Sequence, residues 1–295
     1  MVEERSVLEL GIGLALVCAV VTQLGFLCKH RGAGCAPLVS LRRPLASARA
    51  LLASKWFAIG MAIAAGAWIL HVFALALAPL STVQVVLSTG VVILAVLGDR
   101  VFGCRVSRRQ WAGAAVTTGG LLLLVVTLPR QGGQTTFATP ALVAFEVGML
   151  ALGTLLVAAP RLGTPSHHHG AVLGAAAGVL FGVSDVSIKA LTAIAGTGPL
   201  ALAASPWLPV AVLASGIAFL ASARGFQQGD AVPVIACTST AANVTCILGG
   251  ILVFGDRLAA GTVLVALQVT AFALVACAAL LMPAGHGQAP AAARA

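Results

Sequence analysis

Four ionisable residues lie inside long apolar stretches of this sequence: His71, Glu146, Asp185 and Lys189. Such side chains are costly inside a membrane, and where they occur there they mark substrate or ion paths. Asp185 and Lys189 are four residues apart, so on a helix they share a face and can pair directly. Two interpretations stay open. The pair neutralises itself and locks one helix, or Asp185 binds a solute or coupling ion while Lys189 tunes it or exchanges partners with Glu146.

The four groups are predicted to meet at one depth. A helix rises about 1.5 Å per residue, which places them roughly 10 Å from the outer ends of their predicted helices. His71 follows Trp68 by three residues on the same face, where it could titrate near neutral pH or cap an aromatic wall. A packed, hydrogen-bonded histidine is the equal alternative. A cation site would use Asp185 and Glu146 as its carboxylate ligands.

Uncharged polar residues gather in two further apolar stretches. The stretch 231–254 holds Asn243 among several threonines, and its counterpart 81–102 holds Gln84. In lipid such groups need partners, so they face protein or a water-filled cavity. Gln84 and Asn243 are therefore candidate binding residues, although hydrogen bonding between helices would explain them equally well.

The composition requires that these residues lie in a membrane. Of the 295 residues, 60% are hydrophobic and only 8% are charged, with a mean hydropathy of +1.06, whereas soluble domains carry about a quarter charged residues. A span needs about 20 apolar residues in helical form. We predict an all-α polytopic protein with nine transmembrane helices, at 6–28, 56–78, 81–102, 111–129, 139–158, 171–193, 207–223, 231–254 and 260–282.

The basic residues predict the orientation. Most of the seventeen Lys and Arg residues fall on one side if the segments 29–55 and 99–110 are cytoplasmic. The positive-inside rule then places the N-terminus outside the cell and the C-terminus in the cytoplasm. The same clustering between apolar stretches argues against nucleic acid as a partner.

A short phrase occurs twice and indicates a duplication. Residues 101–106 read VFGCRV and residues 253–258 read VFGDRL. We predict two four-helix repeats, 6–129 and 171–282, joined by the single helix 139–158 and followed by a disordered cytoplasmic tail, 283–295. Because one helix joins the repeats, the second is inverted, as in many secondary transporters.

The repeated unit resembles a known superfamily. A Gly-Asp-Arg triplet after the third span and a glycine-rich final span, WAGAAVTTGG, are similar to the drug/metabolite transporter (DMT) superfamily with EamA-like repeats. The segments GFLCKHRGA and HVFALALAPLSTVQVV resemble its NIPA-like branch, which is associated with magnesium transport. The resemblance implies a secondary transporter of the plasma membrane. Cys104 stands where the first repeat usually has an acid, so Cys104–Arg105 and Asp256–Arg257 are not chemically equal.

Four glycines occur at every fourth position, one just before the stretch 171–193 and three within it. Such a ridge allows close helix packing. We expect an internal seam, with a homodimer face as the alternative. The glycines are Gly170, Gly174, Gly178 and Gly182.

Catalytic motifs are missing. The sequence has no P-loop, no His-Glu-x-x-His and no Gly-x-Ser-x-Gly, so we expect neither an enzyme nor a cofactor. The expected function is alternating-access transport of a small solute, either magnesium or another divalent cation, or an organic metabolite or drug exported with proton or gradient coupling. Lys189 beside Asp185 opposes a cation. A non-transporting membrane scaffold is the alternative of another class.

Overall fold

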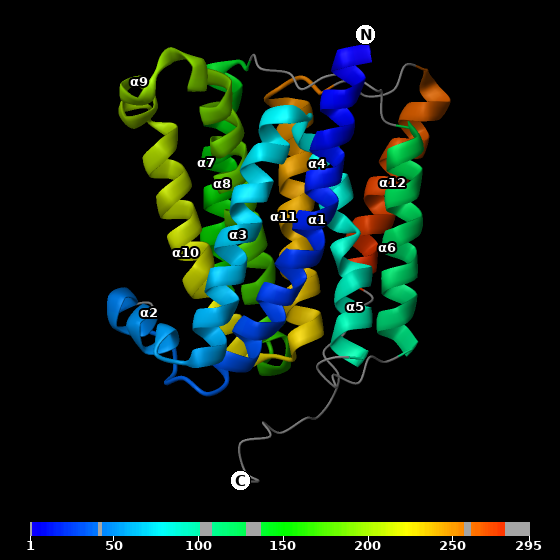
Figure 1. Cartoon of the computed structure of the whole chain (residues 1–295). Helices are drawn as coiled ribbons and strands as arrows, with labels where there is room; N and C mark the ends of the chain where they lie inside the picture. The colour runs from blue at the N-terminus through cyan, green and yellow to red at the C-terminus, as the bar shows by residue number, and fades with distance from the viewer. Residues whose placement is uncertain (1, 41–42, 101–107, 128–136, 257–260, 281–295) are drawn as a thin grey trace.

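The computed structural model describes residues 2–40, 43–100, 108–127, 137–256 and 261–280, and these residues form a bundle of helices (Figure 1). The helices are α1 (Val2–Ala33), α2 (Pro44–Leu52), α3 (Lys55–Leu77), α4 (Leu80–Ser88), α5 (Gly90–Arg100), α6 (Arg108–Thr127), α7 (Thr139–Ala158), α8 (His169–Ile194), α9 (Pro199–Ala204), α10 (Trp207–Gln228), α11 (Ala231–Leu252) and α12 (Thr262–Leu280). Single 3₁₀ turns cover Ala159–Arg161, Ser166–His168 and Ala195–Thr197.

The described residues fold as an all-helical membrane protein. Six helical segments are long and apolar enough to cross a bilayer, and they contain α1, α3, α7, α8, α10 and α11. In lipid a helix satisfies its own backbone hydrogen bonds, which is why continuous apolar sequence folds in this way. Helices also occupy the other three predicted ranges. The count of nine spans stays a prediction, as do the predicted domain boundaries, and the tail 283–295 lies outside the described residues.

One predicted span is two helices. Residues 81–102 were expected as a single helix, but α4 ends at Ser88 and α5 begins at Gly90. Between them, the Thr89 hydroxyl donates to the Val86 carbonyl at 2.7 Å and competes with the helical hydrogen-bond pattern. The corresponding stretch in the second half of the chain, α11, is continuous over 22 residues.

The two halves of the chain pack alike. α1 lies along α3, and α8 lies along α10, while α4 contacts α11 and α6 contacts α12. α1 and α8 run in opposite directions in Figure 1. Helices α1 and α10 finish at one end of the bundle, and α3 and α8 begin there (Figure 1). We call this end of the bundle the basic end. The inverted relation of the two repeats stays a prediction.

The glycine ridge of α8 lies inside the bundle. A Cβ on Gly174 would come within 2.7 Å of the Val234 carbonyl oxygen of α11, and one on Gly182 within 2.5 Å of Thr245 Cβ. Gly178 faces Thr238 of α11 in the same way, and Gly170 lies against Gly229. Without side chains at these positions, α8 and α11 come into backbone contact along the ridge.

One glutamine ties the segment after α1 to the end of α10. The Gln227 side-chain oxygen accepts from the backbone N–H of Val39 at 2.8 Å. Its amide nitrogen donates to the carbonyls of Ala33, Ala36 and Pro37 at 3.2, 3.4 and 3.0 Å. A non-helical segment thereby gains the hydrogen-bond partners that its own backbone lacks.

We expect Gln227→Ala to lower the thermal unfolding midpoint of the purified protein by about 5 °C, because several hydrogen bonds of about 1 kcal/mol each are lost. The neighbouring Gln228 is the matched control, since its side-chain oxygen is buried without a hydrogen-bond partner. Gln228→Ala should cost less in a fluorescence-monitored melt. Equal shifts for the two variants would show that the Gln227 contacts contribute no specific stability.

Candidate functional site

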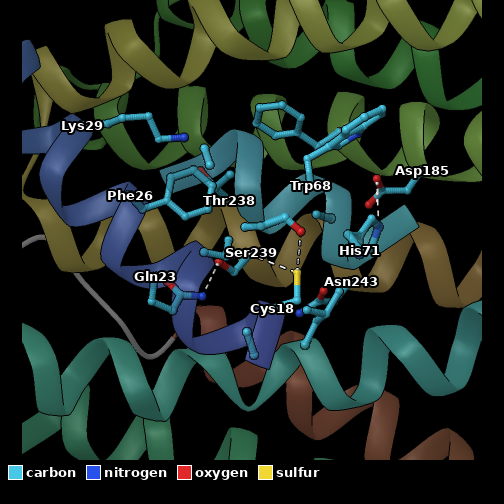
Figure 2. Close-up of a pocket in the computed structure, with 17 residues that line it drawn as sticks. Cys18, Gln23, Phe26, Lys29, Trp68, His71, Asp185, Thr238, Ser239 and Asn243 are labelled. Atoms are coloured by element: carbon cyan, nitrogen blue, oxygen red, sulfur yellow. Dashed lines mark hydrogen bonds and ion pairs between the residues drawn. The ribbon is translucent and has the colours of Figure 1, made fainter. Parts of the chain in front are cut away.

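A cavity of about 190 Å³ lies among α1, α3, α8 and α11, with one residue from α4 (Figure 2). Helices from both predicted repeats therefore build it. The lining residues are Cys18, Ala19, Thr22, Gln23, Phe26 and Lys29 of α1; Ala64, Ala67, Trp68 and His71 of α3; Leu87 of α4; Phe181 and Asp185 of α8; and Thr238, Ser239, Ala242 and Asn243 of α11.

A histidine and a carboxylate face each other at one end of the cavity. His71 Nε2 lies 3.2 Å from Asp185 Oδ1, and His71 is only 7% exposed. The second carboxylate oxygen, Oδ2, is 3.5 Å from the Cys246 sulfur of α11. Asp185 is thus held between α3 and α11, and it can balance a positive charge on His71 or on a bound solute.

A lysine lies at the other end of the cavity. Figure 2 shows Lys29 and Asp185 on opposite sides of the lining residues. The Lys29 ammonium is 4.1 Å from the centroid of the Phe26 ring, within the range of a cation–π contact. The cavity therefore has a cationic end, an end with a carboxylate and a histidine, and a largely apolar wall between them.

An amide in the lining has unused hydrogen-bonding capacity. Gln23 is 2% exposed, and its nitrogen donates to the Ser239 hydroxyl at 3.4 Å, while its side-chain oxygen has no hydrogen-bond partner. Gly90, the first residue of α5, lies so near that an added Cβ would be 2.5 Å from the Gln23 nitrogen. Gln23 therefore connects the cavity to the interruption between α4 and α5.

Lys189 does not contact Asp185 in the way that their spacing suggests. Its ammonium donates to the carbonyl of Leu75 and, at 3.1 Å, to that of Ala78, and the residue is 3% exposed. The last carbonyls of a helix have no intrahelical donor, and α3 ends at Leu77. The ammonium thus supplies hydrogen bonds to the end of α3, while Asp185 faces His71.

Glu146 also lies apart from the cavity. It is 3% exposed on α7 and accepts a hydrogen bond from the Ser187 hydroxyl of α8. Glu146 and Lys189 are not among the lining residues, whereas Asp185, His71, Trp68 and Asn243 are. The structure therefore brings together four of the seven predicted binding residues.

Several predicted residues lie outside the described part of the chain. These are Cys104, Arg105 and Arg257, together with the side chain of Gln84. Asp256 is described and is 8% exposed, with its backbone N–H bonded to the Gly250 carbonyl at 2.9 Å. Among the described residues, no three His, Cys, Asp or Glu side chains are grouped closely enough to hold a metal ion.

Comparisons with known proteins support one relationship. No family model matches the chain, and no solved structure matches it. The chain is 25% identical over 262 residues to a protein of Arabidopsis thaliana named "Probable magnesium transporter NIPA9", and the match covers 84% of this chain and 74% of that protein. Together with the six apolar helices, this likeness supports a multi-pass membrane protein that is similar to this NIPA protein.

Proposed function

We propose that this protein is a secondary transporter that carries a small solute across the plasma membrane by alternating access, with the cavity as its binding site. The observation that carries the proposal is the pair His71 and Asp185, which faces a cavity and lies on two helices long and apolar enough to cross a membrane. Ionisable groups inside a membrane are retained where a solute or ion needs them. A further support is that α1 and α3 of one half and α8 and α11 of the other line the same cavity, as in carriers built from inverted repeats.

A divalent cation, magnesium first, is one candidate solute. The likeness to a protein named as a probable magnesium transporter favours it, and so does the carboxylate of Asp185 in the cavity. Magnesium keeps several of its waters and needs only one or two carboxylates from a protein. A water takes about 30 Å³, so a cavity of 190 Å³ has room for a partly hydrated ion.

An organic solute with an anionic group is the second candidate, and the lining favours it. Lys29 repels a cation but can bind a carboxylate or phosphate. Phe26, Trp68 and Phe181 supply the aromatic wall typical of sites for organic molecules.

Flux measurements test the transporter and its solute together. We expect Asp185→Asn to lower magnesium flux into proteoliposomes by roughly 10–100-fold, because it removes the only carboxylate that the described residues contribute to the lining. Asp99→Asn is the matched control, since Asp99 is exposed near the end of α5. Equal loss in both variants would contradict a role for Asp185 in the path.

Magnesium flux through the wild-type protein, compared with that through Lys29→Met, separates the two solutes. For a magnesium carrier, removal of the ammonium lowers the electrostatic barrier, so magnesium flux rises or is kept. For a carrier of an organic anion, folded wild-type protein moves no magnesium.

A scaffold without transport activity would bind no solute in the cavity, and its assembly would depend on the glycine ridge rather than on Asp185.

A further inference from the structure

The helix α2 presents an apolar face that the rest of the described chain leaves uncovered. Leu45 and Leu52 lie seven residues apart on this helix and are 85% and 48% exposed. Leu38, in the segment that leads to α2, is 81% exposed. In Figure 1, α2 lies at the basic end and at the outer edge of the bundle, near the start of α3 and the end of α10. Its exposed face can therefore reach the lipid that surrounds the bundle.

The opposite face of α2 is firmly attached. Leu51 is fully buried and belongs to a core cluster with Phe26 and Phe57. The Ser47 hydroxyl donates to the Ser40 carbonyl at 3.2 Å and accepts from the Ser40 N–H at 3.0 Å. The exposed leucines are therefore held in place before any partner binds.

Positive charge accompanies the exposed leucines. Arg49 lies between Leu45 and Leu52 on the helix surface and is exposed, and so is Arg43 at the start of α2. The chain has no acidic residue from Lys29 through Gly98, so no carboxylate of this segment neutralises the arginines. Nearby, the Arg31 guanidinium is 4.4 Å from the centroid of the Trp56 ring, a pair typical of the membrane interface.

We propose that α2 is a docking surface for anionic lipid, with Leu38, Leu45 and Leu52 inserted among the acyl chains and Arg43 and Arg49 bound to phosphate-containing headgroups. Helices that combine apolar and basic residues lie in the interface of anionic bilayers. The committed partner is the bilayer leaflet at the basic end. Because Gln227 ties the segment before α2 to α10, the proposed lipid site lies beside a contact between the two halves of the chain.

The test places a reporter on α2 of the full-length protein in lipid nanodiscs. Leu45→Trp is compared with the unsubstituted protein, whose four tryptophans give the background emission. The discs contain phosphatidylcholine and phosphatidylglycerol, and in separate samples one or the other carries brominated acyl chains that quench nearby tryptophan. We expect the added tryptophan to be quenched, and more strongly by brominated phosphatidylglycerol than by brominated phosphatidylcholine at equal mole fraction.

Arginine variants identify the source of that preference. Arg43→Gln with Arg49→Gln should bring quenching by the two lipids close to equal, because each basic residue near the surface is worth about fivefold in preference for anionic lipid. Arg161→Gln, an exposed site at the same end, is the matched control and should keep the preference. Water-like, unquenched emission from Leu45→Trp would overturn the docking surface. Equal quenching by both lipids with the arginines intact would overturn the assignment to anionic lipid. Neither outcome depends on transport activity.

Discussion

Gly178→Leu is expected to prevent the chain from reaching a monodisperse folded state. A Cβ there would overlap the Thr238 carbonyl oxygen and come within 2.7 Å of Ala241 Cβ and 2.9 Å of the Ala242 nitrogen. Two of these are backbone atoms, which cannot turn aside as a side chain can. Since α8 contacts α11 at Gly174, Gly178 and Gly182, moving one helix from the other would open the centre of the bundle, at a cost of about 3 kcal/mol or more.

Gly148→Leu is the matched control for Gly178→Leu. Gly148 lies on α7, where no atom lies within 4 Å of an added Cβ. Size-exclusion chromatography of the detergent-solubilised protein and its thermal unfolding midpoint measure the difference. A Gly178→Leu protein that elutes and melts like the Gly148→Leu protein would show that the backbone contact of α8 and α11 is dispensable.

Lys189→Met is expected to have the second largest effect. Methionine keeps most of the apolar stem but has no hydrogen to donate, so the carbonyls of Leu75 and Ala78 are left without this partner. A buried carbonyl without a donor costs about 1–3 kcal/mol, which predicts a loss of several kcal/mol in unfolding free energy. The substitution also removes the positive charge that is electrostatically coupled to Asp256.

The control for this variant is Lys55→Met, at the exposed start of α3. Thermal unfolding should show a fall of about 5–10 °C for Lys189→Met and little change for the control. Lys189→Arg should recover part of the loss, since a guanidinium also donates. If Lys189→Met melts at the wild-type temperature, the ammonium does not hold the end of α3.

The apolar stretches predicted the positions of most helices because hydrophobicity alone decides which residues enter lipid. The predicted span 139–158 coincides with α7, but the predicted span 207–223 ends before the helix that it corresponds to, α10. Helix α10 continues to Gln228, with Gly225 and Phe226 buried. The helix α2 was missed because a short helix of mixed character has no continuous apolar signal. Its sequence marks are Pro44 at the first turn and the leucines seven residues apart.

The site was predicted only in part, for reasons of helix packing. The four-residue spacing of Asp185 and Lys189 shows what can pair on one helix, but it does not show what the neighbouring helices offer. Here His71 of α3 faces Asp185, and carbonyls at the end of α3 accept hydrogen bonds from Lys189. Lys29 was assigned to a loop, yet α1 continues to Ala33 and carries Lys29 into the cavity.

The two halves of the chain share a second short motif besides the repeated VFGxR sequence. Gly-Asp-Arg occurs at 98–100 as well as at 255–257, so the first half does carry an acid close before Cys104. The two copies differ in their surroundings, since Asp99 is exposed near the end of α5 and Asp256 is buried. An exposed acid costs nothing to keep, whereas a buried one must be compensated by its neighbours.

The interruption at Thr89 makes the two halves mechanically unequal. In a perfectly symmetric inverted carrier, the inward-open and outward-open states would be related by a twofold rotation and would have equal free energy. Here the helix is interrupted between α4 and α5 at Thr89, while the corresponding stretch α11 is continuous over 22 residues. Under the proposed alternating-access function, this difference would make the two open states unequal in free energy, so in the absence of solute one of them would be more populated. On the proposed transport function, the chain would therefore have a resting side that follows from its backbone.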